Sequence, residues 1–219
     1  MLIEPNSYLY IYVVDRDFGF APNPFHGFCT LATCKPGIRK NARIGDWVMG
    51  VGGSRLKATG KCVFFMKVNE ITTFDEYWED NRFKLKKPVR NGSSVMMVGD
   101  NIYHRKSKNA PWIQEDSHHS NQDGSMNLDN LQRDTKSINV LISELFFYFG
   151  SAAPIVDLNS IGYSNHIGYS KRSTEEQCVS TFILNIFCEF QHDKNIVMAD
   201  PVNFNIASRR VDQKTGNIR

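Results

Sequence analysis

Two nearby polar segments carry side chains that could perform acid–base or metal chemistry. GDNIYHR supplies Asp100 and His104, and EDSHHS supplies Asp116, His118 and His119. Two imidazoles and a carboxylate can hold a divalent metal that activates water in an open coordination position. If the protein is an enzyme, these residues are its candidate catalytic group, and a divalent metal is the cofactor that they would allow.

Other interpretations of these residues stay open. Adjacent His118 and His119 point in different directions in an extended chain, and neither H-x-x-x-H nor H-x-E with a C-x-x-C partner occurs, which disfavours a zinc deaminase. Without a metal, either histidine could hydrogen-bond a base, a phosphate or the backbone while Asp116 holds its tautomer. The segments could equally be a polar surface loop without a role. No cofactor is predicted from them alone.

A basic segment lies earlier in the chain and contains Arg39, Lys40 and Arg43. If residues 38–42 form a helical turn, Arg39 and Arg43 share one face at i, i+4, and their guanidiniums could bracket a phosphate. The alternative is a solvated loop whose charges keep the surface soluble. A P-loop is excluded in the glycine-rich run that follows, because Cys62 stands where that motif requires Ser or Thr.

Size and composition limit the class of protein. A chain of 219 residues, 41% of them hydrophobic, can bury one sizeable core, so we expect a single domain over residues 1–219. The formal charge of +3 is too mild to identify a nucleic-acid binder. Five cysteines without a C-x-x-C pair, and an N-terminus without secretory features, favour a reduced cytoplasmic setting. No apolar run reaches the roughly 18 to 20 residues needed to cross a bilayer, so we expect no membrane association.

Short strands dominate the expected secondary structure. β-branched and aromatic runs predict strands over residues 8–14, 28–33, 46–51, 60–71 and 137–149, and one or two strands over 95–103. A short helix should begin at Thr73, with Glu76 completing a capping box. A longer helix should follow Ser173 or Thr174, with one apolar face formed by Val179, Phe182, Ile183, Ile186 and Phe187.

These elements predict an α+β fold built on a curved or closed mixed sheet with a few flanking helices. Strands and helices do not alternate regularly, which disfavours a doubly wound parallel sheet. Residues 105–136 are polar and form a predicted functional loop or insertion, and residues 212–219 form a predicted tail. An exposed strand edge could support a homodimer.

Two resemblances add a functional setting. Residues 35–78, with basic residues, A-R-x-G-D, a strand, a glycine-rich turn and an acidic-aromatic helix, resemble the first half of PUA-like barrels of the EVE and YTH type, which read modified bases. DFGFAPNPFHGFCTLATCKPGIRKNARIGDWVMG, GDNIYHR, WIQEDSHHS and FFYFG resemble the nucleotide modification associated domain family, second subtype. That family is linked to modified DNA bases in phage and bacterial modification or defence systems.

The resemblances imply roles for particular residues. The residues that would neutralise phosphates are Arg39, Lys40 and Arg43. The residues that would stack on a flipped base are Phe18, Phe20 and Trp112. The residues that would contact its edge are Asp15, Asp17 and Gln114. Stacking is worth roughly 1 to 3 kcal/mol per base, enough to offset unstacking when edge contacts add to it. Core packing is the alternative for each aromatic, and the favoured one for Phe20 and Trp47.

Three hypotheses for function follow. The leading one is a non-enzymatic module that binds nucleic acid or a nucleotide and reads a modified base in a DNA-modification or phage-defence setting. The second is an enzyme that acts on a base or nucleotide through the Asp and His residues. The third is a sensor of a free signalling nucleotide.

Overall fold

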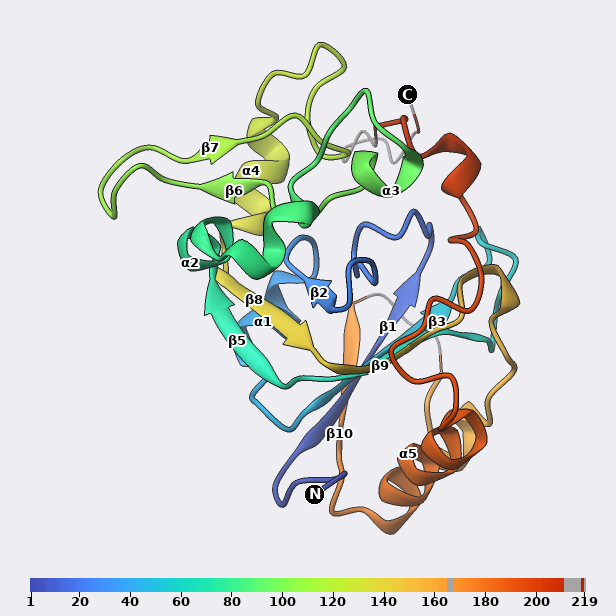
Figure 1. Cartoon of the computed structure of the whole chain (residues 1–219). Coiled ribbons are helices and arrows are strands. Elements are labelled where there is room, and N and C mark those ends of the chain that lie inside the picture. The colour runs from blue at the N-terminus through green and yellow to red at the C-terminus, as the bar shows by residue number, and fades with distance from the viewer. Residues whose placement is uncertain (165–167, 211–217, 219) are drawn as a thin grey trace. The chain divides into compact units, whose positions relative to one another are not determined.

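The computed structural model describes residues 1–164, 168–210 and 218, and the chain forms two compact units (Figure 1). Unit 1 comprises Met1–Asp17, Asn41–Glu70 and Ser143–Val202, and unit 2 comprises Phe18–Lys40, Ile71–Ile142 and Asn203–Arg219. The single domain expected from length stays a prediction. The predicted tail, residues 212–219, lies outside the described residues except for Ile218.

Unit 1 is built on a five-stranded sheet with the order β10-β1-β3-β4-β9. Its strands are β1 (Tyr8–Val14), β3 (Trp47–Gly52), β4 (Cys62–Lys67), β9 (Leu145–Tyr148) and β10 (Tyr169–Ser173). β1 and β3 are parallel, and the other neighbours are antiparallel. β3 and β4 are buried along their whole length, which explains their nearly continuous apolar sequences.

Aromatic rings fill the core of unit 1. Trp47 stacks on Phe65 with ring centroids 4.5 Å apart, so Trp47 is a core residue as expected. Helix α5 (Gln177–Phe190) buries Val179, Phe182, Ile183 and Ile186, four of the five residues of the predicted apolar face, while the fifth, Phe187, is half-buried. The helix begins later than predicted, since its N-cap is Glu176. Two short 3-10 helices, η2 (Gly150–Ala152) and η3 (Leu158–Ile161), also belong to this unit.

Unit 2 holds short elements joined by long loops. β2 (Cys29–Leu31), β8 (Asn139–Ser143) and β5 (Glu70–Thr73) form a sheet in the order β2-β8-β5, and β6 (Tyr103–His104) pairs with β7 (Ile113–Gln114) as a hairpin. The helical elements are α1 (Pro36–Asn41), α2 (Phe74–Glu79), η1 (Asn81–Lys86), α3 (Ser94–Met97), α4 (Leu128–Asp134) and η4 (Phe204–Ile206). The polar insertion therefore contains β7 and α4 rather than loop alone.

Several local predictions need correction. The strand predicted over residues 95–103 is wrong, because Ser93 caps the short helix α3 and only the last residue of that range joins β6. The single bent strand over 60–71 is two strands, β4 and β5. The run 137–149 is also two strands, separated at Glu144, whose N–H donates to Asn69. The Thr73–Glu76 capping box is confirmed at α2.

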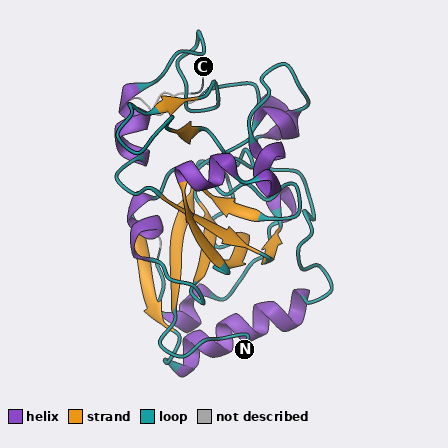
Figure 2. Cartoon of the chain, turned by 60° about the vertical axis from the view of Figure 1, so that its left-hand side comes forward, coloured by secondary structure: helices purple, strands orange, loops and turns teal. Residues whose placement is uncertain are grey.

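The α+β class is confirmed, with strands and helices mixed along the chain (Figure 2). The described strands form open sheets of five, three and two strands, so the closed PUA-like barrel is not found among them. Within the described residues, no helix combines the length and the apolar character needed to cross a bilayer.

Candidate active site

Unit 2 brings together a cysteine, a histidine and an aspartate from three separate segments. Cys34 lies in the turn between β2 and α1 and has a φ of 56°. His119 lies in the turn after β7, and Asp134 is the last residue of α4. We refer to Cys34, His119 and Asp134 as the triad.

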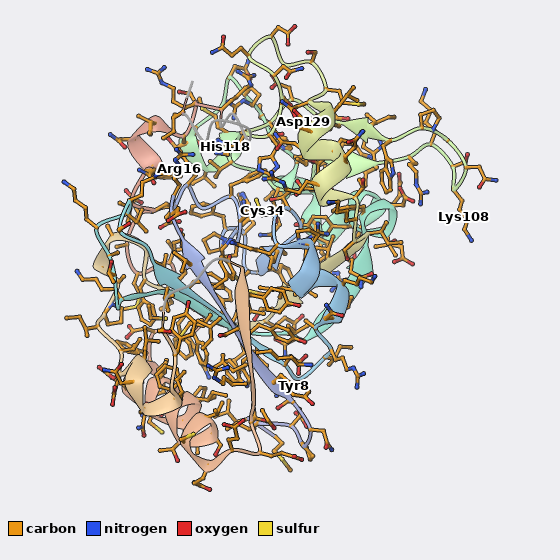
Figure 3. The ribbon with its side chains drawn as sticks, turned by 180° about the vertical axis from the view of Figure 1, so that it is seen from behind. Tyr8, Arg16, Cys34, Lys108, His118 and Asp129 are labelled. Carbon is orange, nitrogen blue, oxygen red and sulfur yellow. The ribbon has the colours of Figure 1, made fainter. Side chains whose placement is uncertain are left out.

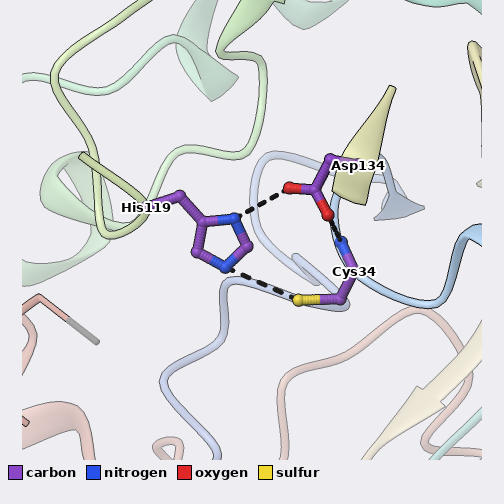
Figure 4. A group of neighbouring side chains, drawn as sticks. All are labelled: Cys34, His119 and Asp134. Carbon is purple, nitrogen blue, oxygen red and sulfur yellow. Dashed lines mark hydrogen bonds and ion pairs between the residues drawn. The ribbon is translucent and has the colours of Figure 1, made fainter. Parts of the chain in front are cut away.

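The side chain of His119 lies between Cys34 and Asp134 and contacts both (Figure 4). Cys34 Sγ lies 3.6 Å from His119 Nε2. His119 Nδ1 lies 2.8 Å from Asp134 Oδ2. The backbone N–H of Cys34 donates to Asp134 Oδ1 at 2.9 Å. One carboxylate therefore orients the imidazole and also fixes the backbone of the residue that bears the thiol.

The turn that carries His119 is fixed by local hydrogen bonds. The N–H of Ser117 donates to Ser120 Oγ at 2.9 Å, and the N–H of His119 donates to Ser117 Oγ at 3.2 Å. The carbonyl oxygen of His119 accepts bonds from Gln114 Nε2 at 3.2 Å and from Asn130 Nδ2 at 2.6 Å. Short polar side chains thus hold the turn, as is common where the backbone leaves regular structure.

The side chain of Arg39 binds the backbone of two triad residues. Its guanidinium is fully buried and donates to the carbonyl oxygens of Cys34 (2.9 Å) and Asp134 (2.5 Å). It also donates to the carbonyl oxygens of Ser137 and Asn139, both at 2.7 Å. Arg39 therefore joins the backbones of two triad residues, and we treat it as a positioning residue.

The charges of the triad support one another. Burial lowers the pKa of His119, but electrostatic interactions and hydrogen bonds with Cys34 and Asp134 outweigh it and raise this pKa to about 10. Burial raises the pKa of Asp134, but the charge and hydrogen bond of His119, the charge of Arg39 and the hydroxyl of Tyr103 hold it below its ordinary value. The surroundings of His119 thus favour its protonated form.

The three side chains lie close enough to be considered as metal ligands, since one ligand atom from each falls within 4.8 Å of the others. The hydrogen bonds argue against that use. Asp134 Oδ1 accepts a hydrogen bond from the Cys34 N–H. Asp134 Oδ2 is hydrogen-bonded to His119 Nδ1 and accepts a hydrogen bond from the Tyr103 hydroxyl at 2.9 Å. The carboxylate is thus committed to hydrogen bonds, which leaves only Cys34 and His119, fewer protein ligands than zinc usually requires.

The three residues of the triad differ in solvent exposure. Cys34 is partly exposed, His119 is 2% exposed, and Asp134 is fully buried. A nucleophile must meet its substrate, whereas the groups that activate and orient it are stronger when water is excluded. The exposure of the triad follows that order.

The residues predicted to be catalytic separate into different local pairs. His119 belongs to the triad. His118 packs on Phe18, with ring centroids 4.2 Å apart, and its Nδ1 lies 2.6 Å from the Arg209 carbonyl oxygen. Asp116 pairs with Arg210 at 2.5 Å.

The other two predicted catalytic residues also have partners of their own. His104 bonds Glu115 at 2.9 Å and stacks on Trp78 at 3.8 Å. Asp100 is buried and accepts bonds from the Thr30 and Tyr77 hydroxyls. Catalytic roles for His104, Asp100, His118 and Asp116 stay predictions.

The residues predicted to bind phosphate also separate. Arg39 is buried and bonded to carbonyl oxygens, so it is not placed to bracket a phosphate. Lys40 and Arg43 are exposed, and Arg43 lies beyond the end of α1, so the predicted helical pair does not form. Another exposed cation of unit 2, Lys108, was not among the predicted residues and lies at the outer end of the β6–β7 hairpin (Figure 3). Phosphate binding by Lys40 and Arg43 stays a prediction.

The residues predicted to contact a base are mostly structural in this conformation. Phe18 and Phe20 are 4% and 3% exposed, and core packing is confirmed for Phe20. Trp112 lies partly exposed beneath the guanidinium of Arg105, whose Cζ is 4.4 Å from the ring.

The polar members of the same group differ in exposure. Asp17 is buried and bonded to the Tyr148 hydroxyl, and Asp15 is exposed. Gln114 is buried, and it donates to the Tyr103 hydroxyl and to the His119 carbonyl oxygen. Base contacts by Asp15, Asp17, Gln114 and Trp112 stay predictions.

Sequence reasoning missed Cys34 and Asp134. Neither lies in a recognised catalytic motif, and the three triad residues are scattered along the chain at positions 34, 119 and 134. One signal was available: a cysteine with histidine and aspartate residues elsewhere in the chain is a general pattern for a candidate nucleophile. Asp134 gave no comparable signal.

The α+β fold and a partly exposed thiol held by a buried imidazole and carboxylate define a candidate thiol-dependent enzyme. Comparison with family models identifies the family: the chain belongs to the nucleotide modification associated domain 2 family, whose model matches residues 6–208. The predicted family is thus confirmed over nearly the whole chain, and the weaker PUA-like similarity is not shown. No curated protein and no solved structure matches the chain.

Proposed function

We propose that this protein is an enzyme of nucleotide modification in which Cys34 is the nucleophile, His119 is the acid–base residue and Asp134 orients His119. The observation that carries the proposal is the continuous contact from Cys34 Sγ through both ring nitrogens of His119 to Asp134. The family, which is associated with nucleotide modification, supports a base or a nucleotide as the substrate.

A protonated His119 would first stabilise the Cys34 thiolate and then act as a general acid. An imidazolium beside a thiol stabilises the thiolate, which is the reactive form of cysteine. After the thiolate attacks an electrophile, the Nε2 proton of His119 can move to the atom that gains electron density. Asp134 keeps its charge throughout, since three hydrogen bonds and the nearby Arg39 guanidinium stabilise the carboxylate.

This proposal takes the enzyme hypothesis over the non-enzymatic reader. A reader needs an exposed aromatic surface for the flipped base, and two of the three predicted stacking residues, Phe18 and Phe20, are buried. Their rings pack against His118, and Phe20 also packs against His119, at centroid distances of 4.2 to 5.3 Å. In this conformation both rings are thus packed against histidines, and only Phe20 contacts a triad residue.

Alkylation by iodoacetamide tests the thiolate–imidazolium pair. Peptide mass spectrometry should show Cys34 reacting faster at pH 7 than Cys178, although Cys178 is the more exposed thiol. His119→Gln should slow the alkylation of Cys34 by tenfold or more and leave Cys178 unchanged, because only Cys34 loses its partner. Equal or slower alkylation of Cys34 in the wild-type protein would overturn the proposal.

Protection of Cys34 from alkylation by added ligands tests the class of substrate. Free deoxynucleotides or a DNA oligonucleotide should slow the alkylation of Cys34 while Cys178 reacts as before. Protection by mononucleotides alone indicates a nucleotide substrate, and protection only by the oligonucleotide indicates a polymer. If a signalling nucleotide raised the melting temperature without protecting Cys34, the sensor hypothesis would replace the enzyme.

A further inference from the structure

The β6–β7 hairpin of unit 2 begins at the triad. Its first cross-strand pair joins Tyr103 to Gln114. The Tyr103 hydroxyl donates to Asp134 Oδ2 at 2.9 Å and accepts a hydrogen bond from Gln114 Nε2 at 3.1 Å. Gln114 Nε2 also donates to the carbonyl oxygen of His119 at 3.2 Å. Hydrogen bonds from both strands therefore fix the base of the hairpin against two triad residues.

The rest of the hairpin is basic. Residues 104–114 contain Arg105, Lys106 and Lys108 and neither Asp nor Glu. Lys106 and Lys108 are exposed, and Lys108 lies well away from Cys34 at the outer end of the hairpin (Figure 3). The hairpin therefore extends from the triad to a tip that presents two ammonium groups to solvent.

The guanidinium of Arg105 fixes the conformation of this tip. Its Nε and Nη2 donate to Asp75 Oδ2 of α2 at 3.0 and 2.5 Å, and its Nη1 donates to the carbonyl oxygen of Lys108 at 2.7 Å. Its Cζ also lies 4.4 Å from the ring of Trp112 in the returning half of the hairpin. Lysines that only keep a surface soluble do not need a fixed backbone, whereas a preorganised loop lowers the ordering cost of binding.

We propose that the β6–β7 hairpin binds the phosphate backbone of a nucleic-acid strand and holds a base of that strand at Cys34. This inference rests on the proposed function and names the substrate as a base within a polymer. An ammonium group binds phosphate as a point charge, and such contacts position a strand without reading its sequence.

The length of the hairpin favours a polymer over a free nucleotide. Lys108 is five residues from Tyr103, a reach of at most about 16 Å in an extended strand. Duplex DNA carries a phosphate about every 3.4 Å along each strand, so this reach spans several nucleotides. Phosphates at the tip therefore belong to neighbours of the nucleotide at the triad, and a free nucleotide has no such neighbours.

Fluorescence anisotropy with a labelled DNA single strand, its duplex and an RNA of the same sequence tests the proposal. We expect Lys106→Gln/Lys108→Gln to weaken the binding of at least one of them by about tenfold or more at about 50 mM salt. The log–log salt slope should fall by about 1.4 on a single strand or about 1.8 on a duplex, because two phosphate contacts are lost. Lys57→Gln/Lys194→Gln is the matched control, since it removes two exposed lysines of unit 1 and the same net charge. It should change the affinity by less than about twofold.

Protection of Cys34 from iodoacetamide connects this binding with the triad. The oligonucleotide that binds most tightly should protect Cys34 in the wild type, and Lys106→Gln/Lys108→Gln should require about ten times more of it. Without oligonucleotide, Cys34 should be alkylated at the same rate in both proteins, which shows that the substitutions leave the triad intact. Any protection by mononucleotides should also be equal in the two.

The outcomes separate this inference from the proposed function. Equal oligonucleotide affinity of the wild type and the hairpin variant, or equal losses in the hairpin and control variants, would overturn the inference and leave the nucleophile in place. Competition by poly-glutamate as strong as that by nucleic acid of equal charge would also overturn it, in favour of an acidic protein partner. Protection of a fast-reacting Cys34 by mononucleotides alone overturns the polymer and keeps the proposed function. Slow alkylation of Cys34 overturns the proposed function, and the anisotropy titration still decides whether the hairpin binds nucleic acid.

Discussion

Replacement of Asp134 by asparagine tests the electrostatic account of the triad directly. The substitution keeps the size of a fully buried side chain and removes its charge. His119 then loses the charge of one of the two partners that raise its pKa to about 10, while the burial that lowers this pKa remains. We expect the pKa of His119 in Asp134→Asn to fall from about 10 toward its ordinary value of 6.5.

The size of the expected loss of stability can be related to the raised pKa of His119. Raising a pKa from 6.5 to about 10 corresponds to about 5 kcal/mol of net stabilisation of the imidazolium, at 1.36 kcal/mol per pKa unit. Removing one member of a buried ion pair typically costs about 3 to 5 kcal/mol, and Arg39 would also lose its nearby counter-charge. We therefore expect the free energy of unfolding at pH 7 to fall by about 3 to 5 kcal/mol.

Two assays measure these quantities. Long-range ¹H–¹⁵N NMR of the imidazole from pH 5 to 11 gives the pKa of His119, and urea unfolding at pH 7 gives the stability. Asp129→Asn is the matched control, since it makes the same change on the exposed side of the same helix. A pKa of His119 that stays near 10 in Asp134→Asn would refute the reasoning, and so would equal effects of the two substitutions.

Three further predictions concern the supporting structure. Burial raises the pKa of Asp100 to about 6, so this carboxyl contributes stability that is complete below its ordinary value of 3.8 and is lost as pH rises through 6. Urea unfolding between pH 3.5 and 7 should show that loss in the wild type but not in Asp100→Asn, and parallel curves would contradict the prediction. Arg39→Met leaves buried carbonyl oxygens without their donor, each costing about 1 to 3 kcal/mol, whereas Lys40→Met at the exposed neighbour should change stability by less than about 0.5 kcal/mol. Equal melting temperatures for these two variants would count against the role of Arg39. Gly99→Ala would place a Cβ 2.3 Å from the Lys86 carbonyl oxygen and should destabilise by about 1 to 3 kcal/mol, so a calorimetric melting temperature equal to the wild type would show that the backbone yields there.

Elements with strong local signals were predictable from sequence. β1 matches its predicted range because apolar residues, most of them aromatic or β-branched, run from Tyr8 to Val14 and are followed by Asp15. The start of α2 was found because both halves of its capping box lie three residues apart. α3 was missed because Val95 and Met96 favour a strand locally, while the cap of Ser93 and the surrounding loops decide for a helical turn.

The triad, in contrast, could not be predicted from local sequence signals. Of its three members, only His119 was a candidate, because adjacent histidines in a polar segment are visible in any sequence. Arg39 was expected to face phosphate, yet it is buried, because the carbonyl oxygens that it binds come from residues 34, 134, 137 and 139. A sequence shows that a side chain is charged but not whether distant carbonyl oxygens will surround it.

By itself, the amino-acid sequence determined the family, the α+β class, the capping box of α2 and the apolar face of α5. Each of these depends on residues that are close in the chain or on a pattern that extends along it. Only the tertiary structure decided that Cys34, His119 and Asp134 meet and that Arg39 supports them. That assembly depends on hydrogen bonds between segments about a hundred residues apart, as between Cys34 and Asp134, and such contacts are set by the packing of the whole unit.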